Sequence, residues 1–138
     1  MKKVFIFIAA MFALASCAYI EDVFEDSSNK FVGEYTVKFV YDNGKTEALV
    51  EPALITKTGV NSVKFFNAEA FNTVGSTKGH KVNFEDVVVE DVGTKIGMDF
   101  NEGELIGNIL TVPFSAMYVS STVSSKETGV MVLTKVSK

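Results

Sequence analysis

The sequence predicts an all-β domain built from a single antiparallel meander of seven to nine strands. Residues 34–41 alternate apolar or aromatic with mostly polar side chains, which is the period of a half-buried strand. Glycines from Gly59 to Gly129 separate further short apolar runs, as turns do. Only residues 67–74 could form a helix, of about two turns. Strands without long helices must close into a small barrel or, as the alternative, stack as a two-sheet sandwich.

The first sixteen residues have the pattern of a signal peptide. Lys2 and Lys3 precede eleven uncharged, mostly apolar residues, Val4 to Leu14. A helix that spans a bilayer needs about 20 apolar residues, so this run is too short for a permanent anchor. We expect residues 1–16 to be removed.

The run ends in Leu14-Ala15-Ser16-Cys17, which resembles the lipobox of bacterial lipoproteins. The resemblance implies that Cys17 carries a diacylglycerol, and that its new amine receives a fatty acid such as palmitate. Two or three acyl chains anchor a protein stably, whereas one chain binds only marginally. A plain secretory signal is the alternative. Cys17 is the only cysteine, so its modification would leave no disulfide and no thiolate nucleophile.

The mature chain is predicted to be acidic. Removing 16 of 138 residues, two of the 13 lysines among them, leaves 122 residues with a formal net charge of −6. All basic side chains are lysine, and arginine is absent. An acidic chain without arginine is a poor phosphate clamp, so we expect no nucleic-acid partner.

Residues 17–30 are predicted to be the lipidated cysteine and an acidic tether. They contain Glu21, Asp22, Glu25 and Asp26 and show no sustained alternation. Acidic residues soon after the cysteine resemble the surface-export signal of Bacteroidota lipoproteins, which implies display on the outer leaflet. A solvated linker without any export role is the alternative.

The clearest turn signal is Asn43-Gly44, which favours a two-residue type I′ hairpin. Such a turn places Tyr41 opposite Thr46 and Phe39 opposite Ala48. A second tight turn is expected around residues 101–103, which would pair the strands on either side of it. The remaining strands are predicted at 53–57, 62–67, 81–85, 87–91, 95–100, 104–114, 117–121 and 130–136.

The domain predicted for residues 31–138 resembles the calycin-like, lipocalin-like barrel lipoproteins of Bacteroidota. The resemblance rests on the opening Phe31-Val32-Gly33-Glu34-Tyr35, the early hairpin, the mid-chain glycines and a hydrophobic last strand. Lipocalin relatives carry Gly-x-Trp near the first strand, where this chain has Tyr35. In such a barrel, aromatic side chains either fill the core or line a ligand cavity; the candidates are Tyr35, Phe39, Tyr41, Phe65, Phe84 and Phe100.

The sequence offers no catalytic or metal-binding constellation. His80 is the only histidine and lies in a glycine-flanked segment, so neither a hydrolytic triad nor a zinc site is expected. We therefore expect a non-enzymatic protein without a cofactor, held by lipid in the outer membrane of the cell envelope and binding a small apolar ligand. The alternative is a protein-interaction module, such as an inhibitor or an accessory subunit of an outer-membrane complex.

Overall fold

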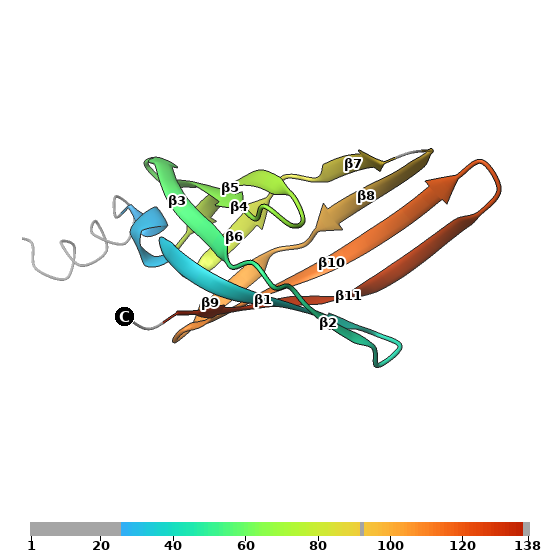
Figure 1. Cartoon of the computed structure of the whole chain (residues 1–138). Coiled ribbons are helices and arrows are strands. Elements are labelled where there is room, and N and C mark those ends of the chain that lie inside the picture. Colours follow the sequence, from blue (N-terminus) through green and yellow to red (C-terminus); the bar gives the residue numbers. More distant parts are fainter. Residues whose placement is uncertain (1–25, 92, 137–138) are drawn as a thin grey trace, which may run out of the picture.

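The computed structural model describes residues 26–91 and 93–136, and in it eight strands close into an antiparallel barrel that three further strands extend (Figure 1). The order round the barrel is β11-β1-β3-β4-β5-β6-β9-β10, and β11 closes the circle by pairing with both β1 and β10. The all-β prediction is confirmed, and the barrel is selected over the sandwich. The elements are η1 (Ser27–Lys30), β1 (Gly33–Tyr41), β2 (Thr46–Ala48), β3 (Ala53–Gly59), β4 (Ser62–Phe66), β5 (Asn72–Lys78), β6 (Lys81–Phe84), β7 (Val87–Asp91), β8 (Thr94–Phe100), β9 (Gly103–Ile106), β10 (Ile109–Ser120) and β11 (Ser124–Lys135).

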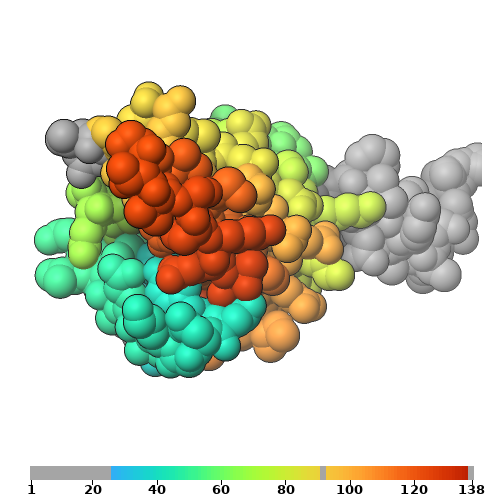
Figure 2. Space-filling view, turned by 90° about the vertical axis from the view of Figure 1, so that its right-hand side faces the viewer, coloured from blue at the N-terminus to red at the C-terminus, as the bar shows by residue number. Residues whose placement is uncertain are grey.

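The two ends of the barrel differ. At one end η1 lies against the strands, and we call this the closed end (Figure 1). At the other end β7, β8, β10 and β11 continue as a four-stranded sheet, while β2 pairs with the last residues of β1. We call this end the mouth; the turns β1–β2, β7–β8 and β10–β11 surround it. Figure 2 views it end-on, with the β10–β11 ribbon and the β1–β2 hairpin toward the reader.

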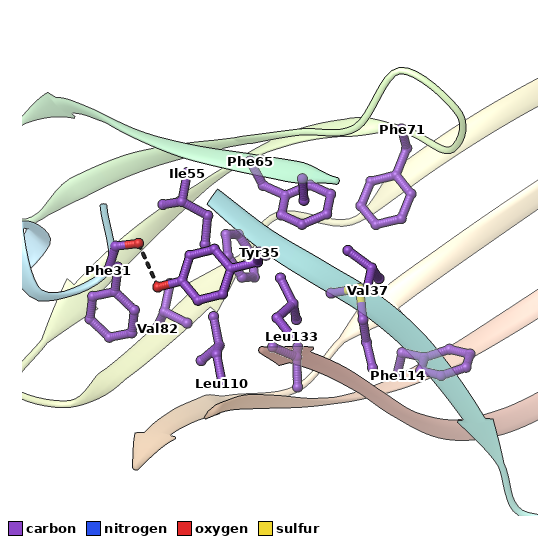
Figure 3. Close-up of a cluster of buried hydrophobic side chains, with 14 of the residues drawn as sticks. Phe31, Tyr35, Val37, Ile55, Phe65, Phe71, Val82, Leu110, Phe114 and Leu133 are labelled. Carbon is purple, nitrogen blue, oxygen red and sulfur yellow. Dashed lines mark hydrogen bonds between the residues drawn. The ribbon is translucent and has the colours of Figure 1, made fainter. Parts of the chain in front are cut away.

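The closed end is filled by the chain that leads into β1. Phe31 and Tyr35 are both 0% exposed, and the Tyr35 hydroxyl donates a hydrogen bond of 2.7 Å to the Phe31 carbonyl (Figure 3). Lys135, on the last strand, lies with its Nζ 5.8 Å from the centre of the Tyr35 ring and donates to the Lys30 carbonyl. Burial raises the pKa of Tyr35 to about 12, because the ionised phenol would have no solvent. The first and last strands are thus joined by side chains as well as by backbone pairing.

Residues 26–30, which the sequence assigned to the tether, pack against the barrel. Asp26 caps η1: its Oδ1 accepts hydrogen bonds from the Ser28 amide, the Ser28 hydroxyl and the Asn61 amide. Lys57 forms an ion pair with the same carboxylate. Ser27 and Ser28 are buried, so residues 26–30 of the predicted tether belong to the barrel. No alternation marked them in the sequence, because their contacts are to a distant turn.

We expect Asp26→Asn to weaken the barrel at neutral pH and to have less effect in acid. The Lys57 ion pair, followed by the hydrogen bonds from Ser28 and Asn61, holds the pKa of Asp26 well below its usual range. A lowered pKa in the folded state stabilises the fold above about pH 4, and this contribution disappears as the pH falls through the folded value. Urea unfolding at pH 7 and pH 3 measures this; replacing the exposed Asp99 by Asn is the control. A difference from wild type that grows toward pH 3 would contradict the assignment.

The predicted register of the first hairpin is wrong by one residue. Phe39 pairs with Glu47 and Lys38 with Ala48, because the turn has three residues, 42–44, in place of two. The Gly44 amide donates to the Tyr41 carbonyl and Gly44 has φ +92°, whereas Asn43 does not adopt the positive φ of a type I′ turn. All three residues of β2 are exposed, so burial does not select a register there.

The second predicted turn is also wrong. The chain does not reverse at residues 101–102: β8 and β9 lie end to end along β10, with a one-residue change in register between them. The reversal occurs one strand later, where Gly107 (φ +62°) lies between β9 and β10. The helix considered for residues 67–74 is absent; these residues form a turn and the start of β5.

Candidate functional site

The mouth contains a cavity of about 380 Å³. Strands β1, β2, β7, β8 and β10, the segment after β2 and the loop between β4 and β5 all contribute to its lining. Ligand cavities in proteins range from about 300 to about 1,000 Å³ and are mostly apolar. The lining here is of that kind: Phe39, Tyr41, Glu47, Leu49, Glu69, Ala70, Phe71, Val89, Ile96, Met98, Phe114, Ala116 and Tyr118.

Three aromatic rings form a cluster at the cavity. Phe39 and Phe114 meet edge to face with centroids 5.4 Å apart, and Tyr41 meets Phe114 in the same way at 5.7 Å. Tyr41 and Phe114 come from strands on either side of β11, and Gly129 lies opposite both in the register. Because Gly129 has no side chain, the two rings meet across it.

The wall beside these rings comes from alternate residues of the extended sheet. Ala116 and Tyr118 of β10 lie opposite Met98 and Ile96 of β8, respectively. On the other side of β8, Val89 of β7 lies opposite Ile96. Successive residues of a strand point to opposite faces, so all five side chains share the inner face. Met117, between Ala116 and Tyr118, points outward and is 46% exposed. The alternation of inward- and outward-facing residues thus continues beyond the core, where the inward-facing side chains line the cavity.

The loop between β4 and β5 is held at the mouth by Asn67, which is only 2% exposed. Its Nδ2 donates to the carbonyls of Glu51 and Pro52, and its Oδ1 accepts from the amides of Glu69 and Ala70. Glu69 Oε1 in turn accepts from the Val50 and Glu51 amides at 2.8 and 3.0 Å. These bonds fix Ala70 and Phe71 at the cavity, because the loop and the segment after β2 hold each other.

Asn67→Ala is expected to destabilise the barrel by about 1–2 kcal/mol, since four hydrogen bonds of a buried side chain are lost together. Hydrogen exchange at the Glu69 and Ala70 amides should rise in the variant. Asn83→Ala, at an exposed position of β6, is the matched control and should change neither quantity. Equal effects of the two substitutions would show that Asn67 does not hold the loop.

A second, outer space of about 510 Å³ adjoins the cavity and shares Tyr41, Glu47 and Tyr118 with it. Its lining adds Lys45, Thr46 and Glu127. The Tyr41 hydroxyl donates to Glu47 Oε1 at 3.1 Å. Partial burial, and then the nearby Glu47 carboxylate, raises the pKa of Tyr41; burial and then Glu127 raise that of Tyr118. Both phenols therefore stay neutral at physiological pH, and Tyr41 uses its single hydroxyl hydrogen on Glu47.

The six aromatic residues suggested as ligand-lining divide between two environments. Phe39 and Tyr41 line the cavity. Tyr35, Phe65 and Phe84 are at most 5% exposed and fill the barrel interior, where Phe65 also stacks on Phe71 at 5.0 Å (Figure 3). Phe100 is partly buried and packs against Phe71 and Phe84, at 5.4 and 6.2 Å. The proposed lipidation site, Cys17, and the residues Leu14, Ala15 and Ser16 lie outside the described residues.

Sequence reasoning missed most of the mouth. Tyr118, Ile96 and Met98 carry the same alternation as the core residues, and nothing in the alternation marks where the core ends. Glu69 and Phe71 lie in the segment considered as a helix. One usable signal was the length of the strand at residues 109–120. Its 12 residues exceed the usual strand length of about three to ten residues, so part of it must extend beyond the barrel.

Within residues 26–91 and 93–136, no group of three or more His, Cys, Asp or Glu side chains is arranged to hold a metal ion. His80 is exposed in the β5–β6 turn. No helix in the same part of the chain combines the length and the apolar character that crossing a bilayer requires.

No family model and no curated protein matches the chain. Among solved structures, one described as EF1p2_mFAP2b bound to DFHBI is similar, with a TM-score of 0.48 and 10% sequence identity. The likeness covers 82% of this chain and 99% of that chain. A similarity at this level does not indicate what the present chain binds.

Proposed function

We propose that this protein is a non-enzymatic binding barrel that holds a small apolar ligand in its mouth. The observation that carries the proposal is the cavity of about 380 Å³, lined by the Phe39–Tyr41–Phe114 cluster and the inner face of the extended sheet. A barrel with a purely structural role would need no such space, since protein interiors that hold no guest are close-packed, as the barrel interior around Phe65 and Phe84 is.

We further propose that the barrel is anchored by lipid at Cys17 in the outer membrane of a bacterial cell envelope. This rests on the lipobox resemblance of Leu14-Ala15-Ser16-Cys17. The position of Asp26 at the closed end fits such an anchor, because the mouth would then point away from the bilayer. Eight residues separate Cys17 from Asp26, and a fully extended chain of that length reaches at most about 28 Å.

Methionine methyl groups give a direct test of ligand binding in the full chain. Met98 lines the cavity, whereas Met117 is exposed on the outer face of the neighbouring strand. Titrating the methyl-¹³C-methionine protein in nanodiscs with 1-decanol should shift the Met98 methyl resonance saturably and leave Met117 in place. An unmoved Met98, or equal movement of both resonances, would refute binding in the mouth.

Matched substitutions locate the site. Ala116→Phe places a ring in the cavity from β10 and should abolish the Met98 shift, whereas Met117→Phe adds a ring to the outer face and should preserve it. Circular dichroism of each variant checks that the barrel is retained. Persistence of the Met98 shift in a folded Ala116→Phe variant would contradict the proposed site.

The anchor has its own test. Mass spectrometry of the mature protein from its own cells should find residue 17 as the first residue, carrying a diacylglycerol on sulfur and an acyl group on nitrogen. Cys17→Ser should release the protein from the membrane fraction. A free thiol at residue 17 in protein recovered from the medium would refute the anchor.

A second candidate function, a protein-interaction module, is favoured by β7. Among the described strands β7 pairs only with β8, so its other edge offers backbone groups to an added strand. Val88, the second residue of this strand, is 69% exposed. Val88→Lys should abolish capture of a stoichiometric partner from solubilised membranes, and Val60→Lys, on an exposed turn, should not.

A further inference from the structure

The lining of the mouth cavity carries an unbalanced negative charge. Two of its thirteen lining residues are carboxylates, Glu47 and Glu69, and none of the thirteen is a lysine. The adjoining outer space adds Glu127 and a single cation, Lys45. Counting both spaces, three carboxylates face one ammonium group at the place where a ligand would enter.

Within residues 26–91 and 93–136, none of these three carboxylates forms an ion pair. The described residues form the pairs Lys57–Asp26, Lys81–Glu102 and Lys95–Glu90, none of which involves Glu47, Glu69 or Glu127. Glu69 accepts two backbone amides and Glu47 accepts one phenol, both through Oε1. Hydrogen bonds to neutral donors fix the carboxylates in place without cancelling their charge.

Two aromatic rings lie at the same rim. Tyr41 and Tyr118 line both spaces, beside Glu47. The face of an aromatic ring carries partial negative charge and attracts ammonium groups placed over it. The raised pKa values of Tyr41 and Tyr118 have carboxylates among their causes, which agrees with a negative potential at the rim.

We propose that the mouth selects ligands that join an apolar body to one cationic amine or ammonium group. The apolar body packs against Phe39, Phe71 and Phe114, and the cation lies at the rim among Glu47, Tyr41 and Tyr118. A fatty acid or another anionic amphiphile would meet repulsion at the same rim. This inference rests on the proposed function of the cavity and adds the chemical class of its ligand.

Three probes with one chain length test the charge preference. Decyltrimethylammonium, 1-decanol and decanoate are titrated below the concentrations at which they aggregate or separate from solution into the full chain in nanodiscs, with the Met98 methyl resonance as the readout. We expect the ammonium probe to bind about tenfold more tightly than decanoate, with the alcohol between them. Equal affinities, or tighter binding of decanoate, would overturn the charge preference while leaving the cavity as a binding site. Failure of all three probes to shift Met98 would refute the proposed function itself.

Charge variants give the sign of the effect. Glu47→Gln should lower the ratio of ammonium to alcohol affinity about three- to tenfold, and Lys45→Gln should raise it. Glu104→Gln removes the same charge from an exposed position on β9 and should leave the ratio unchanged. Because partition of the probes into lipid is the same for every variant, the ratios report the site alone. An equal fall in Glu47→Gln and Glu104→Gln would assign the effect to net charge and overturn the proposal.

Discussion

Gly129→Ala is expected to destabilise the barrel by about 3 kcal/mol, because no room exists for a methyl group at this position. A Cβ on Gly129 would contact the Val40 carbonyl oxygen directly and would lie 2.8 Å from the Tyr41 Cα. Both are backbone atoms of the paired strand, so no side-chain rotation can relieve the overlap. The pairing between β1 and β11 must then open at the mouth, and urea unfolding should measure the resulting loss of stability.

Gly97→Ala is the matched control. Gly97 also lies inside a strand, β8, but an added Cβ would meet no atom within 4 Å. We expect the substitution to stabilise the barrel by about 0.5 kcal/mol, since alanine reduces the conformational freedom of the unfolded chain. In the Gly129→Ala variant, decanol binding at Met98 should weaken as well, because Tyr41 and Phe114 meet across residue 129. Similar unfolding midpoints for the two variants would refute the close approach of β1 and β11.

Tyr35→Ala is expected to cost about 4 kcal/mol, in the range of other large-to-small substitutions of buried aromatic rings. The ring is 0% exposed at the closed end, and Phe31, Val82 and Leu110 lie beside it (Figure 3). Tyr35→Phe keeps the ring and removes only the hydrogen bond to the Phe31 carbonyl, so we expect it to cost about 1–2 kcal/mol. Urea unfolding of both variants separates the packing of the ring from the hydrogen bond of its hydroxyl.

Burial of the Tyr35 hydroxyl should also make the stability of the barrel depend on pH in the alkaline range. Its pKa rises from 10.0 to about 12 on folding because the ring is buried. A raised pKa in the folded state contributes stability that is complete below pH 10 and is lost as the pH climbs through about 12. The stability difference between wild type and Tyr35→Phe should therefore shrink over this interval. A difference that stays constant from pH 9 to pH 12 would mean that the phenol is not shielded from solvent.

Local pattern predicted the strands well where one face is buried. The alternation in residues 34–41 placed Tyr35, Val37 and Phe39 inside the barrel, and all three are buried. Several later runs, such as 62–67 and 95–100, became strands with bounds shifted by one residue. β11, however, begins six residues before the predicted run 130–136, and the predicted run 104–114 contains the reversal at Gly107. β5, with Gly75 and Ser76 at its centre, was missed because its buried positions include threonines, which give little hydrophobic signal.

Register and chain reversal were predicted poorly, since they depend on contacts between distant segments. Asp42 accepts a hydrogen bond from the Thr128 hydroxyl of β11, and this contact fixes the first turn from outside the hairpin. The sequence 101–103 contains turn residues, yet the chain continues along β10 there because the Asn101 amide donates to the Pro113 carbonyl. Neither partner can be identified from the turn residues alone.

The sequence by itself determined the all-β class, the acidic surface without arginine, and the alternation that decides which side chains face inward. These properties are local, because the identity of each residue and the period of two in a strand are enough to set them. Only the tertiary structure decided that inward-facing residues at one end meet in a packed core, while those at the other end surround a cavity with an acidic, aromatic rim. That outcome depends on how far β8, β10 and β11 extend beyond β1, and on a loop that Asn67 holds by bonds to a separate segment. Both the extension of these strands and the position of this loop depend on pairing between segments far apart in the sequence.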